Sequence, residues 1–311
     1  MGPKPKISKS GHTWGFNGGL SVPTKDAYFK LKDKPKKWRL TRSHRGPRSL
    51  FMCNEGMPRH RPEPQLTWID RGQPLPTPDH AWGALSPAPG LVAASADLSA
   101  MRLVESYSQG IFPWYSNGQP VLWWSPDPRM VLRPQNFRFH RSLRQALKRG
   151  LIQPNFCLCF DRDFQQVIER CSQTPRKGQS GTWIVPDMVK AYKELHDMGL
   201  AHSAELWVNG TLVAGLYFVA LGHAVFGESM FTAVTDGSKM ALAMLVSVCL
   251  QHGIAFIDCQ QNTSHLSSLG AVEITRDEFV EHVHQAQNQP PVNWAGQTLY
   301  WDLLANLDNL T

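Results

Sequence analysis

The chain has 311 residues, of which 42% are hydrophobic and 18% are charged, a composition typical of a globular protein with one or two domains. Six cysteines without a C-x-x-C pair argue against a disulfide scaffold or a zinc ribbon. The motifs H-E-x-x-H, Walker loop and G-x-G-x-x-G are missing from the sequence, which disfavours metallohydrolases, nucleotidases and dinucleotide-binding enzymes. There is neither a secretory signal nor an apolar stretch of the roughly 20 residues that span a bilayer, so we expect a cytoplasmic protein without a membrane partner.

Positive charge is concentrated in the first quarter of the chain. Residues 1–80 contain 16 Lys and Arg against 6 Asp and Glu, whereas residues 81–311 contain 16 against 19. The first quarter is also rich in proline and has no sustained apolar period. We therefore predict that residues 1–65 form a basic, disordered extension. Such a tail can contact RNA, although a solvated tail without function is the favoured interpretation.

The first predicted helix begins after residue 99. Ser99 is a suitable N-cap, Leu103, Val104 and Tyr107 share one apolar face, and Gly110 is a suitable C-terminal end. The following residues, 111–129, contain four Trp or Tyr side chains within eleven positions and several prolines, which disfavours an ordinary helix or a central strand. A packed aromatic core is favoured here over a surface on which nucleic-acid bases stack.

Residues 128–160 form a basic segment without any acidic residue. Coulomb attraction to phosphates requires no sequence-specific geometry, so this segment fits a nucleic-acid backbone, while a solvated helix face remains an equal alternative. The cationic side chains are Arg129, Arg133, Arg138, Arg141, Arg144, Lys148 and Arg149.

The rest of the chain alternates between helical and extended patterns, which predicts an α+β or mixed-sheet fold. The strongest turn signal is Asn209-Gly210, typical of a β-hairpin, and Thr275-x-x-Glu278 is a capping box. We predict helices around 164–171, 186–199, 239–252 and 276–283, and strands at 203–208, 212–221, 224–231 and 254–257.

Polar side chains lie within or directly after two of these apolar strands. Glu228 lies in the third strand, and Asp258 and Gln260 follow the fourth, so these groups are expected to cluster where a pocket opens. The alternative is a structural role in which backbone groups, Lys239 or Arg276 satisfy the two carboxylates.

Eight short motifs, taken together and in this order, closely resemble the leucyl/phenylalanyl-tRNA protein transferase family over residues 66–285. They are DLS at 97–99, GIFPW at 110–114, LWWSPDPR at 122–129, GTWI at 181–184, HSxE at 202–205, GESMF at 227–231, SK at 238–239 and IDCQ at 257–260. The resemblance also indicates that residues 1–56 lie outside the family pattern and that Met57 is the natural start.

The resemblance implies a small N-terminal α/β domain over residues 66–127, a GNAT-like aminoacyltransferase domain over residues 128–290 and a C-terminal tail over residues 291–311. It implies an enzyme that transfers leucine or phenylalanine, and possibly methionine, from its tRNA to the α-amine of proteins beginning with Lys or Arg, which marks them for N-degron proteolysis. The aminoacyl ester is already activated, so no metal or nucleotide cofactor is implied. The expected partners are Leu-tRNA, Phe-tRNA and the acceptor proteins, and a monomer requires no further assumption.

The family pattern also implies roles for single residues. Asp258 and Gln260 resemble the catalytic pair, in which the carboxylate polarises the amide and the amide oxygen accepts a proton from the attacking amine. On an extended segment, the i, i+2 spacing would place both side chains on the same side. The other implied roles are binding of the 3′ aminoacyl-adenosine by Trp114 and Trp183, a pocket for the transferred side chain formed by Leu216, Met230, Leu242 and Ile257, and attraction of the acceptor peptide by Glu228.

Two other classes remain open. An acyl-CoA-dependent N-acetyltransferase shares the expected fold, but residues 232–239 lack the R/Q-x-x-G-x-G/A pyrophosphate loop. A non-catalytic tRNA-binding protein would explain the basic segment and the tryptophans but gives no reason for Asp258 and Gln260 side by side.

Overall fold

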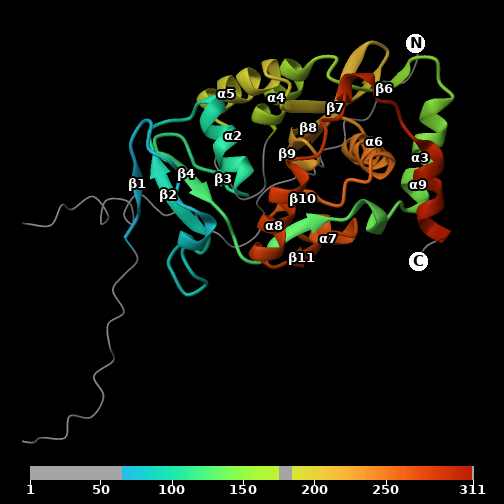
Figure 1. The fold of residues 1–311 in the computed structure, drawn as a ribbon. Helices are drawn as coiled ribbons and strands as arrows, with labels where there is room; N and C mark the ends of the chain where they lie inside the picture. The colour runs from blue at the N-terminus through green and yellow to red at the C-terminus, as the bar shows by residue number, and fades with distance from the viewer. Residues whose placement is uncertain (1–64, 175–183, 310–311) are drawn as a thin grey trace, which may run out of the picture.

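The computed structural model describes residues 65–174 and 184–309, which form two β-sheets with surrounding helices (Figure 1). The predicted basic extension therefore lies, apart from its last residue, outside the described residues. The smaller sheet has the strand order β1-β2-β4-β3 and is antiparallel except for the parallel β1–β2 pair. Its elements are β1 (Trp68–Ile69), η1 (Pro78–His80), β2 (Leu91–Ser95), α2 (Ala100–Ser108), β3 (Phe112–Pro113) and β4 (Val121–Trp124).

Helix α2 begins where the sequence predicts. Ser99 is its N-cap, and the Ser99 side chain accepts a hydrogen bond from the backbone N–H of Arg102. Leu103 and Tyr107 are fully buried, and Gly110 follows the helix at φ 71°, a conformation that glycine adopts without steric cost. The predicted capping and apolar face are thus confirmed, and they direct Tyr107 into the interior.

The aromatic segment at residues 111–129 supplies a central strand, contrary to the prediction. β4 lies between β2 and β3, so the prediction that this segment cannot supply a central strand is wrong. The indole N–H of Trp123 donates to Ser95 Oγ at 2.9 Å, and that of Trp124 donates to the carbonyl of Trp114 at 2.8 Å. Because both polar atoms are satisfied, the rings can be buried within the sheet. The favoured interpretation, a packed aromatic core, is confirmed.

The larger sheet is seven-stranded and mixed, with the order β11-β5-β10-β9-β8-β7-β6. The predicted hairpin is present: β7 and β8 are joined by Asn209 and Gly210, both at positive φ. β9 and β10 are parallel, and the other neighbours are antiparallel. The strands are β5 (Arg129–Leu132), β6 (Phe156–Phe160), β7 (Ala201–Val208), β8 (Thr211–Leu221), β9 (Ala224–Thr232), β10 (Ile257–Gln260) and β11 (Val272–Ile274). The predicted α+β class is confirmed.

Strand β10 starts later than the prediction of 254–257. It runs over Ile257–Gln260 because Ile257 and Asp258 pair with β9 on one side and with β5 on the other. The apolar run suggested a strand that ends before Asp258. The structure places this carboxylate inside the sheet instead, where an arginine neutralises it.

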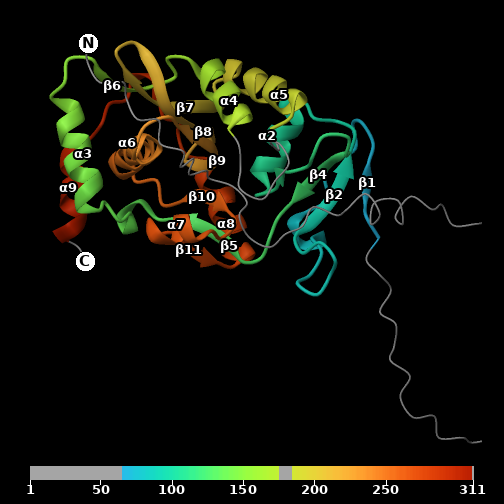
Figure 2. The ribbon, with the colours of Figure 1, turned by 180° about the vertical axis from the view of Figure 1, so that it is seen from behind.

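Helices cover both faces of the larger sheet (Figures 1 and 2). One apolar cluster joins α2, α4, α5 and the smaller sheet, and a second joins α3, α6, α9 and the opposite face of the larger sheet. α6 is buried along most of its length. Thr275 is the N-cap of α8, and its hydroxyl accepts the N–H of Glu278 as predicted. The bounds are α3 (Arg141–Leu151), α4 (Phe164–Gln173), α5 (Pro186–Asp197), α6 (Gly237–Gln251), α7 (Ser264–Ser268) and α8 (Arg276–Ala286), with η2 (Pro134–Asn136) before α3.

The end of the chain is packed, so the expectation of a C-terminal tail is wrong for the described residues up to 309. η3 (Trp294–Gly296), α9 (Trp301–Ala305) and η4 (Asn306–Asn309) follow α8. Trp294 and Leu304 are buried in the second apolar cluster, and the Trp294 ring meets the Phe218 ring edge-on at 4.8 Å. This segment therefore completes the core beneath the larger sheet. Among the described residues, no helix has the length and apolar character of a membrane span.

Candidate active site

Three polar side chains that the sequence singles out lie together on the central strands of the larger sheet. Glu228 is on β9, and Asp258 and Gln260 are on the parallel neighbour β10. All three are nearly fully buried, with at most 2% of each residue exposed. Buried groups of this kind require hydrogen-bond partners, and the partners from outside β9 and β10 come from α2, α5 and β5.

Asp258 is paired with a buried arginine. Arg129 Nε lies 2.8 Å from Asp258 Oδ1 and Arg129 Nη2 lies 2.6 Å from Oδ2, the two-pronged geometry in which a guanidinium binds a carboxylate most strongly. The Arg129 guanidinium also lies over the rings of Phe112 and Phe279, at 4.7 and 4.4 Å from their centroids. Strand β5, strand β3 and helix α8 thus meet around one ion pair.

Gln260 has a strained backbone. A bulge between Asp258 and Gln260 breaks the strand register, and Gln260 has φ 62°, a left-handed conformation that costs a non-glycine residue about 1–3 kcal/mol. Its backbone N–H donates to Asp258 Oδ1 at 2.8 Å, whereas its side-chain Nε2 donates to Glu228 Oε1 at 3.2 Å. The predicted regular alternation along an extended strand is therefore wrong. The carboxylate that contacts the Gln260 amide is Glu228, while Asp258 holds the Gln260 backbone.

Two tyrosines complete the surroundings of Glu228. Tyr107 OH donates to Glu228 Oε1 at 2.6 Å, and Tyr192 OH lies 3.1 Å from Oε2 and 2.5 Å from Tyr107 OH. Burial, together with the charge of Asp258, raises the pKa of Glu228 to about 7 against the opposing effect of these hydrogen bonds. Burial, together with the charge of Glu228, also raises the pKa values of both tyrosines well above their ordinary value, so the hydroxyls remain donors.

The structural alternative is confirmed for a backbone donor, since the Gln260 N–H donates to Asp258 Oδ1, but it is wrong about Lys239 and Arg276. Lys239 pairs with Asp236 at 2.8 Å, and Arg276 donates to the carbonyl of Ser125. Tyr107, Tyr192 and Arg129 take their place. The sequence pattern places Tyr107 on the apolar face of its helix and Arg129 in the basic segment, and it gives no role to Tyr192. Neither pattern carries a signal that distinguishes such residues from ordinary core or surface positions.

The four residues predicted to hold the transferred side chain are packed together. Leu216 and Met230 are opposite each other on β8 and β9, and all four belong to the second apolar cluster. They are Leu216, Met230, Leu242 and Ile257, each at most 3% exposed. Their proximity agrees with a shared apolar pocket, and that role stays a prediction.

The two tryptophans predicted to bind adenosine have different outcomes. Trp114 is buried at 2% exposure against Trp124, with 5.5 Å between the ring centroids, so its indole offers no open face in this conformation. Trp183 lies outside the described residues. Stacking of adenosine on either ring stays a prediction.

The basic segment divides into buried and exposed parts. Arg129 is fully buried in its ion pair, so its assignment to the tRNA backbone is wrong. Arg133 pairs with Glu278 at 2.9 Å and is partly exposed. The remaining cationic side chains lie on or beside α3 and are exposed or half-buried, as a phosphate-binding face requires: Arg138, Arg141, Arg144, Lys148 and Arg149.

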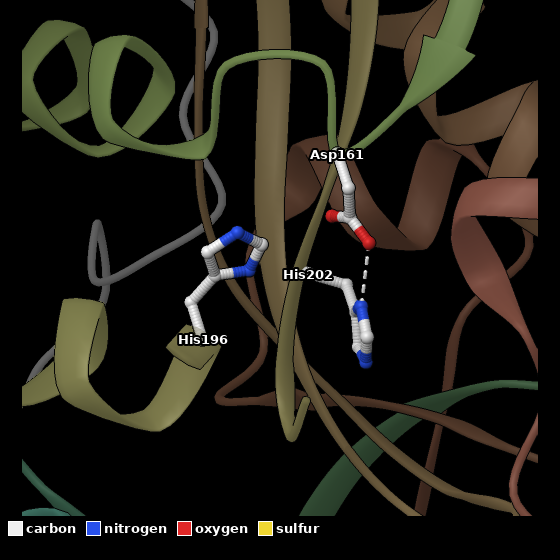
Figure 3. A group of neighbouring side chains, drawn as sticks. All are labelled: Asp161, His196 and His202. Carbon is white, nitrogen blue, oxygen red and sulfur yellow. Dashed lines mark hydrogen bonds and ion pairs between the residues drawn. The ribbon is translucent and has the colours of Figure 1, made fainter. Parts of the chain in front are cut away.

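One other cluster has metal-ligand residue types. Asp161, His196 and His202 offer ligand atoms within 4.8 Å of one another (Figure 3). Hydrogen bonds already engage these groups, since His202 Nδ1 lies 2.7 Å from Asp161 Oδ2, His202 Nε2 lies 3.1 Å from the carbonyl of Gly199, and His196 Nδ1 lies 2.7 Å from the carbonyl of Ala201. These hydrogen bonds join the β6–α4 connection and α5 to the start of β7.

Comparison with known proteins identifies the family of this chain. A family model described as leucyl/phenylalanyl-tRNA protein transferase matches residues 131–284, and the model of its N-terminal domain matches residues 96–127. A leucyl/phenylalanyl-tRNA–protein transferase from Polaromonas sp. is 53% identical over 81% of this chain and 97% of its own length. Another, from Paraburkholderia phytofirmans, is 55% identical over 74% of this chain and 94% of its own length. The chain belongs to this family.

Family membership makes the protein an aminoacyltransferase, as the sequence motifs implied. Solved structures with a related course of the chain include a GCN5-related N-acetyltransferase from Kribbella flavida, with 10% identity, a TM-score of 0.26 and coverage of 56% of this chain and 59% of that one. L-PGS from Bacillus licheniformis has 12% identity, a TM-score of 0.32 and coverage of 53% of each chain. These slight likenesses carry no argument about the site.

Proposed function

We propose that this transferase moves leucine or phenylalanine, and also methionine, from aminoacyl-tRNA to the α-amine of proteins that begin with Lys or Arg, and that the product is an N-degron. The family identity supports the reaction type. The choice of acceptor and the role in proteolysis rest on the resemblance together with the chemistry of the site. The enzyme works as a monomer, since one chain supplies all of the groups invoked below.

The observation that carries the proposal is the orientation of the Gln260 side chain. Gln260 Nε2 donates to Glu228 Oε1, so the amide oxygen of Gln260 points away from Glu228. Among the described residues, none donates a hydrogen bond to Gln260 Oε1. That oxygen is therefore available to accept a hydrogen bond from the attacking α-amine, which orients the amine lone pair toward the ester carbon.

The reaction balances without an external reactant. The amine nitrogen forms a bond to the acyl carbon, the bond between that carbon and the ribose oxygen breaks, and the proton lost by the amine ends on the released ribose oxygen. A neutral amide is a weak base, so Gln260 serves to orient the amine and to pass on its proton. The carboxylate of Glu228 supports this role, because its negative charge attracts positive charge that develops at the amine.

Glu228 does not meet the acceptor directly in this arrangement. It is 1% exposed, and both of its oxygens accept hydrogen bonds from side chains of the protein. Its attraction for a peptide with a cationic first residue therefore acts through the low-dielectric interior rather than through contact. The exposed cations beside α3 hold the tRNA, and the apolar group around Met230 holds the transferred side chain.

The test is transfer of labelled leucine from Leu-tRNA to a peptide that begins with Arg, compared with the same peptide beginning with Ala. Transfer to the Arg peptide alone, abolished by ribonuclease treatment of the donor and strongly reduced in Gln260→Ala, is the expected result. Donors charged with Phe or Met, tested in parallel, rank the three amino acids. Transfer from acetyl-CoA would support the acetyltransferase alternative, and tRNA binding without transfer would support a non-catalytic binder.

A further inference from the structure

We propose that Arg129 is a positioning residue for aminoacyl transfer: by holding the Asp258 carboxylate in one orientation, it fixes the strained backbone of Gln260 and thereby aims the Gln260 amide at the acceptor amine. This inference rests on the proposed function of Gln260. It gives a role to an arginine that burial removes from the tRNA-binding surface.

A continuous path of contacts connects Arg129 to the backbone of Gln260 through Asp258. Arg129 Nε and Nη2 bind the two oxygens of Asp258, and Asp258 Oδ1 also accepts the backbone N–H of Gln260 at 2.8 Å. A carboxylate held at both oxygens cannot rotate about its terminal bond, so the acceptor for the Gln260 N–H has a fixed position. Gln260, at φ 62°, depends on such an acceptor to remain in its left-handed conformation.

The surroundings of the guanidinium restrict its orientation. The rings of Phe112 and Phe279 lie over Arg129 and restrict its plane. Its remaining nitrogen, Nη1, is buried and has no hydrogen-bond partner among the described residues. A buried donor without a partner costs stability, so this arginine is not placed to use all of its donors. The side chain is instead oriented for the two contacts to Asp258.

The role of Arg129 differs from simple neutralisation of the Asp258 charge. A lysine at position 129 would retain the positive charge beside Asp258, but its single ammonium cannot present two parallel N–H groups to a carboxylate. Arg129→Lys therefore removes the fixed orientation and keeps the charge. If the charge were all that mattered, lysine would suffice.

The experiment compares wild type, Arg129→Lys and a matched control, Arg102→Lys, in transfer from Leu-tRNA to the Arg peptide. Arg102 is also a buried arginine, paired with Glu105 Oε2 at 2.6 Å, but it lies outside the site. We expect kcat to fall about 100-fold in Arg129→Lys, the loss typical of misplaced reacting groups, with the KM for Leu-tRNA unchanged. Arg102→Lys should lower the melting temperature and leave kcat unchanged.

A second variant tests whether a guanidinium that is not attached to the chain can replace the Arg129 side chain. Arg129→Gly leaves a cavity, and free guanidinium, added well below denaturing concentrations, is expected to restore transfer saturably. Wild-type kcat in Arg129→Lys, an equal loss in both lysine variants, or folded Arg129→Gly that does not respond to guanidinium would overturn the proposal. Failure of both Arg129 variants to fold would also count against it, because the role would then be structural. Failure of the wild type to transfer would instead overturn the proposed function.

Discussion

The pKa of Glu228 leads to a prediction about stability as a function of pH. Glu228 is fully buried, and burial raises its pKa from 4.5 to about 7. A raised folded-state pKa means that the folded protein binds this proton more tightly than the unfolded chain does. The contribution of this bound proton to the free energy of unfolding is fully present below pH 4.5 and is lost as the pH rises through 7. With 1.36 kcal/mol for each pH unit, the loss is about 3 kcal/mol.

The substitution that removes this effect is Glu228→Gln. The amide keeps the size of the side chain, its oxygen can accept from Tyr107, and its NH₂ group can donate to the Tyr192 oxygen. The variant should therefore fold and should be more stable than wild type at pH 8, by up to about 3 kcal/mol. At pH 4.5 and below, the difference between the two proteins should shrink toward a constant that reflects hydrogen bonding alone.

The assay is urea unfolding of both proteins at half-unit pH steps from 4.5 to 8, with the difference in unfolding free energy plotted against pH. Taking the difference removes other titrating groups, such as His282, whose pKa burial lowers to about 4. A difference that is independent of pH would refute the reasoning, because Glu228 would then not change its ionisation in this range. A difference that moves the other way would mean that the folded protein stabilises the carboxylate.

Three further outcomes are expected. Tyr107→Phe removes a donor that lowers the pKa of Glu228, so the acid limb of the pH–rate profile should move to higher pH; an unmoved limb would contradict this. Arg141→Ala should weaken tRNA binding and reduce the slope of log K against log salt by about 0.7–0.9, whereas an unchanged slope would remove Arg141 from the phosphate-binding face. Leu304→Ala should destabilise the fold by about 2–5 kcal/mol in urea unfolding, while a loose C-terminal tail would leave stability unchanged.

Much of the secondary structure could be predicted because the signals are local. The Ser99 cap, the Asn209-Gly210 turn and the Thr275 cap each depend on residues within a few positions, and the structure contains all three. The C-terminal segment was missed because its elements are too short to show a period. Trp294 and Leu304 are ordered by contacts with α6 and the larger sheet, which are distant in sequence.

The site could be predicted only in part, for the same reason. Glu228, Asp258 and Gln260 were singled out because polar residues in apolar strands are unusual. Which carboxylate meets the Gln260 amide depends on a bulge and on a positive φ, and neither is encoded in the spacing of Asp258 and Gln260. The tyrosine of α2 was missed because a buried tyrosine in an amphipathic helix has the same pattern whether its hydroxyl meets a carboxylate or a carbonyl.

The site combines features that each reduce stability. Within the described part of the chain, Glu228 has no cationic partner in contact and Arg129 Nη1 has no hydrogen-bond partner, while Gln260 has a strained backbone. Groups held in this way are already oriented before the substrate arrives, which saves the reorganisation that water would require. The support comes from both sheets, since Tyr107 on α2 and Phe112 on β3 contact Glu228 and Arg129. The larger sheet therefore carries the reacting groups, but the smaller sheet holds them in place, and a chain without residues 66–127 would lack that support.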